Sequence, residues 1–109
     1  SRMRRLEGNV LLNMLRSIGP ESVERLDLKG SEVLNDTVLR DVAALLTKLR
    51  ALELGNCQEI TASGLVNAIA PSFVHLEELG LQNRTDLEDA HLVAIREACA
   101  QLSRWDVRF

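Results

Sequence analysis

The sequence has few cysteines and no long apolar run, and each absence excludes a class of protein. Two cysteines, Cys57 and Cys99, are too few for a disulfide scaffold, and their apolar surroundings suit buried thiols in a reducing compartment. No apolar stretch approaches the roughly 18 to 20 residues that span a bilayer, and the segment SRMRRLEGNV lacks the apolar run of a signal peptide. We therefore expect a soluble protein of the cytoplasm or nucleus that does not bind membranes.

Basic clusters are also lacking. The chain has 13 basic and 16 acidic residues, a net charge of −3, and no basic run longer than Arg4-Arg5. This charge distribution does not provide the positive field that binds a phosphate backbone, so we expect no nucleic-acid partner. A length of 109 residues, 46% of them hydrophobic and 27% charged, is typical of one folded domain or part of one.

Leucine dominates what is present, and its spacing is periodic. Three segments, VERLDL, LRALEL and LEELGL, and a fourth, LSRWDV, carry apolar residues at their first, fourth and sixth positions. They begin at Val23, Leu49, Leu76 and Leu102, so the period is 26 or 27 residues. Self-similarity at such a fixed period indicates a repeat architecture.

Each repeat is predicted to contain a strand, a turn and a helix. Alternation in L-x-L places both leucines on one face of a short strand. Apolar residues spaced three and four apart then predict three helical stripes: Leu39, Val42, Leu45 and Leu46; Leu65, Ala68 and Ile69; Leu92, Ile95 and Cys99. Candidate N-terminal caps precede these stripes: Asn35 or Asp36, Thr61, and Glu88 or Asp89. Pro20 and Pro71 are expected after helices, and strand–helix–strand succession predicts parallel strands in an α/β fold.

The second repeat, LRALELGNCQEITASGL (residues 49–65), has the pattern L-x-x-L-x-L-x-x-C-x-x-I-T-x-x-G-L. It resembles the cysteine-containing leucine-rich repeats of F-box/leucine-rich-repeat proteins. The resemblance implies a solenoid with short parallel strands on the concave face and helices on the convex face, and a Cys57 that turns inward and bonds the loop backbone. Ser31 and Arg84 replace that cysteine in neighbouring repeats, and Ala62 replaces a usual acidic residue.

The repeat pattern predicts one repeat domain. Residues 6–22 form the helical half of a repeat, residues 23–48, 49–75 and 76–101 form three repeats, and residues 102–109 form a final strand. Because no residues remain for the helix after that strand, we interpret the chain as a fragment whose C-terminal edge is open.

Alternation also predicts which side chains face outward from the strands. The expected middle column is acidic apart from Gly80, and four parallel strands present on the order of 250 Å², well below the roughly 800 Å² that a stable interface needs from each partner. We therefore expect the C-terminal edge at Trp105 to contribute to binding, including self-association. The predicted partner-binding residues are Arg25, Asp27, Lys29, Glu53, Glu78, Gln82, Arg104, Trp105, Asp106 and Arg108.

No catalytic, cofactor or metal site is expected. Cys57 and Cys99 occupy different repeat positions without a C-x-x-C motif, and Cys99 is expected to be partly covered. His75 and His91 are expected to be separate surface residues, and no phosphate-binding glycine loop occurs. Arg84 stands at an inward position, which indicates either a loosened repeat or a displaced loop that contacts a partner.

The predicted function is a non-catalytic module that binds another protein. The family resemblance adds the role of a substrate- or partner-recognition part of a ubiquitin-ligase adaptor. Two alternatives remain, a structural or assembly subunit of a larger complex and a repeat-type regulator of a GTPase, although the period of 26 or 27 residues argues against the regulator.

Overall fold

The computed structural model describes residues 2–73, 75–83, 86–99, 102 and 104–106. A leading helix and a single 3-10 turn precede an alternation of short strands and helices. The elements are α1 (Arg2–Ile18), η1 (Pro20–Ser22), β1 (Arg25–Asp27), α2 (Asp36–Leu45), β2 (Ala51–Glu53), α3 (Ala62–Ser72), β3 (Glu78–Gly80), α4 (Asp89–Ala98) and β4 (Arg104–Asp106).

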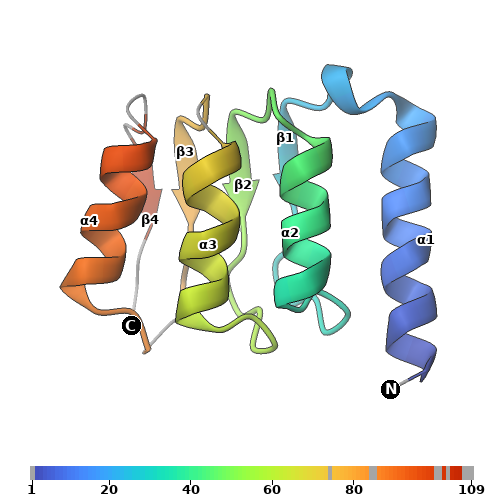
Figure 1. Cartoon of the computed structure of the whole chain (residues 1–109), viewed down its shortest axis with the longest axis horizontal. Coiled ribbons are helices and arrows are strands. Elements are labelled where there is room, and N and C mark those ends of the chain that lie inside the picture. Colours follow the sequence, from blue (N-terminus) through green and yellow to red (C-terminus); the bar gives the residue numbers. More distant parts are fainter. Residues whose placement is uncertain (1, 74, 84–85, 100–101, 103, 107–109) are drawn as a thin grey trace.

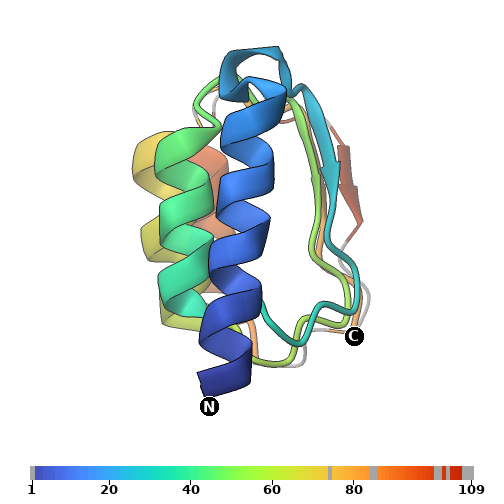
Figure 2. The same cartoon turned by 90° about the vertical axis from the view of Figure 1, so that its right-hand side faces the viewer.

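The strands form one parallel sheet in the order β1-β2-β3-β4, which is their order in the chain. Leu26, Leu52, Leu79 and Trp105 occupy equivalent positions in this register. The helices stand side by side in a second layer on one side of the sheet (Figures 1 and 2). The predicted α/β alternation with parallel strands is therefore confirmed.

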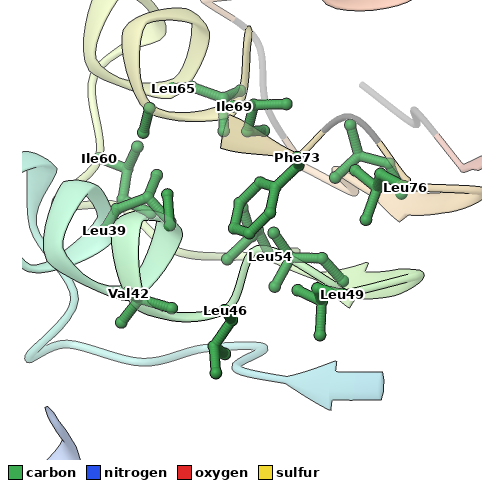
Figure 3. Packing of buried hydrophobic residues seen from close by; sticks show 14 of the residues in the cluster. Leu39, Val42, Leu46, Leu49, Leu54, Ile60, Leu65, Ile69, Phe73 and Leu76 are labelled. Carbon is green, nitrogen blue, oxygen red and sulfur yellow. The ribbon is translucent and has the colours of Figure 1, made fainter. Parts of the chain in front are cut away.

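The core lies between the strand layer and the helix layer. Leu52 and Leu79, at the middle of their strands, are each 2% exposed, and Leu54 and Leu81 follow them into the same interior. Figure 3 shows side chains of α2, of α3 and of the segments that connect helices and strands around Phe73, which is fully buried. Repeating L-x-x-L-x-L leucines thus stack from one repeat to the next, and this burial is the main stabilising term.

Polar side chains order the helix starts and tie two repeats together. Asn35 Oδ1 accepts the N–H of Val38 (2.9 Å), and Thr61 Oγ1 accepts the N–H of Gly64 (3.0 Å), so both residues are N-terminal caps. Asp36 instead reaches the next repeat, where it accepts the N–H (2.8 Å) and the hydroxyl (2.7 Å) of Thr61. Its carboxylate occupies the space that a Cβ at position 64 would need, which explains the glycine there.

Two expectations about prolines and helix ends need correction. Pro71 lies in the last turn of α3, where the N–H of Phe73 still closes the turn on Ile69 O (3.0 Å). The prediction that Pro71 follows the helix was therefore wrong, because α3 ends at Ser72, one residue after Pro71. The helix predicted within residues 6–22 runs over Arg2–Ile18, because Gly19 has a φ of 100° and Pro20 opens η1.

Candidate functional site

The exposed face of the sheet carries an ion pair that spans three strands. Arg25 and Glu78 occupy equivalent register positions on either side of Ala51. The guanidinium of Arg25 donates to Glu78 Oε2 at 2.7 Å, and Ala51 is only 8% exposed. A small residue on β2 therefore leaves room for the two longer side chains to meet across it.

The acidic column of the strand face has a structural role as well as a surface role. Asp27 Oδ1 accepts the N–H of Lys29, and Glu53 Oε1 accepts the N–H of Gly55, both at 3.0 Å. The Glu53 carboxylate also lies over Gly80, where a Cβ would collide with it. These carboxylates order the chain as it leaves each strand, which holds the charged surface in one arrangement.

A depression of about 500 Å³ lies on this face. Six of its lining residues come from the three repeats and include both signs of charge: Arg25, Asp27, Lys29, Glu53, Glu78 and Gly80. We call these six residues the strand-face site. The structure thus brings together five of the predicted binding residues, which are the members of the strand-face site other than Gly80. Gln82 is the second residue after β3. Arg104, Trp105 and Asp106 form β4, the neighbour of β3, whereas Arg108 and Arg84 lie outside the described residues.

The sequence interpretation missed a second charged row just before the strands. Arg50 lies between Glu24 (4.0 Å) and Glu77 (3.6 Å), so one guanidinium bridges the carboxylates of two neighbouring repeats. All three residues occupy the position before the first residue of a strand. Their alternating sign at the repeat period was the signal that could have found them. Exposed pairs of this kind contribute little stability, but they extend the charged surface beside the strand-face site.

A ladder of left-handed residues follows the strands. Gly30, Asn56 and Asn83 have φ values of 71°, 60° and 63°, and they stand at equivalent positions of consecutive repeats. Glycine and asparagine are the residues that tolerate this conformation best. The Asn83 amide donates to Asn56 Oδ1 at 2.7 Å. The recurrence of Gly or Asn at the repeat period was a usable sequence signal for this ladder.

Both cysteines are buried. Cys57 Sγ lies 3.1 Å from Leu28 O and Cys99 Sγ lies 3.3 Å from Phe73 O, and these carbonyls accept the thiol protons. The inward orientation of Cys57 is confirmed, whereas the expectation of a partly covered Cys99 was wrong, because this residue is 1% exposed. Burial raises the pKa of the Cys99 thiol above its ordinary value of 9.0, which disfavours the reactive thiolate.

The two histidines lie in different surroundings. His75 is exposed, and His91 Nδ1 accepts the N–H of Glu88 (3.0 Å) at the start of α4. Across the described residues, no cluster of three or more His, Cys, Asp and Glu side chains could hold a metal ion. In the same part of the chain, the helices are too short or too polar to cross a membrane.

Comparison with known proteins establishes the fold. The chain matches no protein-family model and no curated protein sequence. Among solved structures, it is similar to the tropomodulin C-terminal domain of Caenorhabditis elegans, with a TM-score of 0.59 and 15% sequence identity. The two share one fold. That fold is leucine-rich-repeat-like. The alignment covers 92% of the present chain and 62% of the tropomodulin chain, so the present chain spans less than two thirds of that neighbour.

The comparison overturns the resemblance to F-box/leucine-rich-repeat proteins. The solved structure described above is a tropomodulin domain, and the comparisons give no support for an F-box or a ubiquitin-ligase role. The error has a physical cause, because the leucine spacing, the inward Cys57 and the glycine at position 64 are required by packing and by contacts within the fold. Such a motif identifies the repeat architecture but does not distinguish among families that use it.

Proposed function

We propose that this chain is a non-catalytic protein-interaction module that binds a charged segment of another protein across the strand-face site. The observation that carries this proposal is the depression of about 500 Å³, in which side chains of both charge signs from three strands converge. A leucine-rich-repeat-like fold supports it, since such folds hold a row of side chains on a rigid parallel sheet.

The charges of the strand-face site are accessible to a partner. The side chain of Arg25 is 73% exposed even in its ion pair, and Asp27 and Lys29 are exposed beside it. Exposed ion pairs are weak, so a partner carboxylate can exchange with Glu78 for the Arg25 guanidinium at little cost. The mixed charge favours a partner segment that itself carries both signs, and it fixes the orientation of that segment on the site.

The experiment uses peptides selected from a random library on the native chain, with affinities then measured by calorimetry. A triple variant, Arg25→Ala, Asp27→Asn and Lys29→Ala, removes the charges of the first repeat and keeps an acceptor for the Lys29 N–H. A matched control changes the same residue types on the helix side of that repeat: Arg40→Ala, Asp41→Asn and Lys48→Ala, all exposed.

We expect the strand-face variant to weaken binding at least about tenfold, equivalent to about 1.4 kcal/mol, and the control to leave affinity within about twofold. Both variants should melt close to the native chain, because every altered side chain is exposed. Equal affinities for the native chain and the strand-face variant would contradict the proposal, and a loss confined to the control would place binding on the helices.

A second candidate is a structural or assembly subunit. Large apolar side chains exposed on α1 and α4, the two end helices, favour this function. They lie away from the strand-face site, so assembly through the ends is compatible with peptide binding on the sheet.

A further inference from the structure

The side chains of the first repeat stand out on the exposed face of the sheet. Arg25, Asp27 and Lys29 occupy every second position, so they lie on one face, and all three are exposed. We call them the β1 column. At the equivalent positions of the second repeat, Ala51 is only 8% exposed and Gly55 is buried. The strand-face site is therefore a line of exposed charges along β1 beside a lower surface over β2 and β3, and among the described residues no helix covers it (Figure 2).

Carboxylates line the lower surface, where each lies across a small residue. Glu78 extends over Ala51 and accepts a hydrogen bond from the Arg25 guanidinium (2.7 Å). The Glu53 carboxylate lies over Gly80, in the space that a Cβ would need. Both glutamates are half-buried, unlike the β1 column. A segment laid on this surface would meet acidic groups beneath it and the β1 column along its side.

Charge alternates in sign along the β1 column. Its two cations, Arg25 and Lys29, flank Asp27, and neighbouring members lie about 6.6 Å apart because each residue of a strand rises by about 3.3 Å. Asp27 is also in register with Glu53, so the middle of the site carries two acids side by side. An extended partner presents alternate side chains with the same spacing. The complementary segment therefore carries an acid, a base and an acid at alternate positions.

The β1 column is held in place by contacts within the chain. Asp27 Oδ1 accepts the N–H of Lys29 (3.0 Å), and Glu78 holds the Arg25 guanidinium. Within the described residues, the Lys29 ammonium has no ion pair. A partner acid must therefore replace Glu78 to reach Arg25, whereas it can meet Lys29 without such an exchange.

The size of the depression favours an extended segment over a helix. The three members of the β1 column span about 13 Å. An extended segment of that length, about 4.8 Å wide and about 10 Å deep, takes up about 600 Å³, whereas a helix about 10 Å in diameter takes up about 1,000 Å³. The depression is about 500 Å³. It therefore accommodates most of an extended segment but only about half of a helix.

We propose that the strand-face site binds an extended partner segment with the charge pattern acid-x-base-x-acid. Its base lies beside Asp27 and Glu53, and its two acids lie beside Arg25 and Lys29. This inference rests on the proposed function and adds to it the charge order and the conformation of the partner segment.

The test is a titration of the isotope-labelled 109-residue chain with short capped peptides, followed by NMR. Glu-Thr-Lys-Thr-Glu has the proposed order, and its threonines favour an extended conformation. Lys-Thr-Glu-Thr-Glu has the same composition and net charge in another order, and Glu-Ala-Ala-Ala-Lys-Ala-Ala-Ala-Glu spaces the charges for a helix.

We expect the first peptide to bind with a dissociation constant of about 1 mM or below. The other two should bind at least about threefold more weakly, a modest factor because exposed ion pairs are individually weak. Equal affinities of the two isomers would overturn the proposed charge order, and tighter binding of the alanine peptide would overturn the extended conformation.

Reversing the charge at position 29 tests one contact directly. Lys29→Glu should bind Glu-Thr-Lys-Thr-Glu at least about threefold more weakly, because an attraction becomes a repulsion. Either Lys-Thr-Lys-Thr-Glu or Glu-Thr-Lys-Thr-Lys should then bind this variant as tightly as the original peptide binds the native chain, and the peptide that does so gives the direction of the segment. Failure of both swapped peptides to gain affinity for Lys29→Glu would contradict the proposed contact.

The matched control is Lys48→Glu, at an exposed position after α2. It changes the net charge of the chain by the same amount, so it separates a local contact from a general electrostatic effect. At physiological salt it should leave every affinity within about 1.5-fold of the native value, because screening reduces interactions between distant charges. Both variants should keep native circular dichroism, since each altered side chain is exposed.

The outcomes distinguish this inference from the proposed function. If peptides selected from the random library require the charges of the strand-face site, but Glu-Thr-Lys-Thr-Glu binds no better than its isomer, the proposed function holds and the charge order is wrong. If neither the selected peptides nor Glu-Thr-Lys-Thr-Glu lose affinity for the triple variant Arg25→Ala, Asp27→Asn and Lys29→Ala, both the inference and the proposed function are wrong.

Discussion

Replacing Asp36 by alanine should destabilise the chain by about 2 kcal/mol, although this residue is outside the leucine core. The structure gives this magnitude from two hydrogen bonds, to the N–H (2.8 Å) and the hydroxyl (2.7 Å) of Thr61, worth about 1 kcal/mol each. Asp36 also lies in the first turn of α2, where a negative charge contributes up to about 0.5 kcal/mol more. Partial exposure of the carboxylate reduces the sum toward the lower value.

The assay is thermal and urea unfolding followed by circular dichroism. A loss of about 2 kcal/mol should lower the melting temperature of a chain of this size by about 10 °C. Asp41→Ala, an exposed acid on the same helix, is the control and should change stability by less than about 0.5 kcal/mol. A cycle with Thr61→Val should show a coupling of about 1 kcal/mol, because the two side chains are in contact. Equal losses for Asp36→Ala and Asp41→Ala would refute the reasoning.

Three further predictions concern the core, the strand face and a thiol. Leu79→Ala should cost about 2 to 5 kcal/mol in urea unfolding, and Leu26→Ala clearly less, because only Leu79 is fully enclosed by strands on both sides. Gly80→Ala should destabilise the chain by about 1 to 3 kcal/mol by displacing Glu53, and Glu53→Ala should relieve this loss in the double variant. Labelling of the Cys99 thiol in the native chain should be much slower than in denaturant and remain slow near pH 9.0, because its raised pKa keeps the thiol protonated. The stability that the protonated, buried thiol contributes to the folded state is lost as the pH rises through its folded-state pKa.

The repeat architecture could be predicted from the sequence because its determinants are local and periodic. Alternating leucines fix which face of each strand is buried, and stripes at helical spacing fix the layer that covers them. Thr61 was recognisable as a cap for the same reason, since a cap acts within three residues of itself. The sequence left Asn35 or Asp36 as the cap of the preceding helix, and the structure shows that it is Asn35. The burial of Cys57 was expected from its apolar surroundings, whereas its inward turn and its bond to the loop backbone were implied by the family resemblance.

Contacts between repeats were decided by the tertiary structure, because they join residues 25 or more positions apart. Asp36 binds Thr61 of the next repeat, and the Arg25–Glu78 pair needs a small residue on the strand between its members. The Cys99 thiol donates to a carbonyl of the preceding repeat. Spacing places such residues at equivalent positions, but rotamers and neighbouring backbone determine which of them meet. The resemblance to F-box/leucine-rich-repeat proteins was wrong for a related reason. The motif in residues 49–65 is what packing in this fold requires, so it indicates the fold without indicating the family. Only the comparison of the folded chain with solved structures corrected the resemblance.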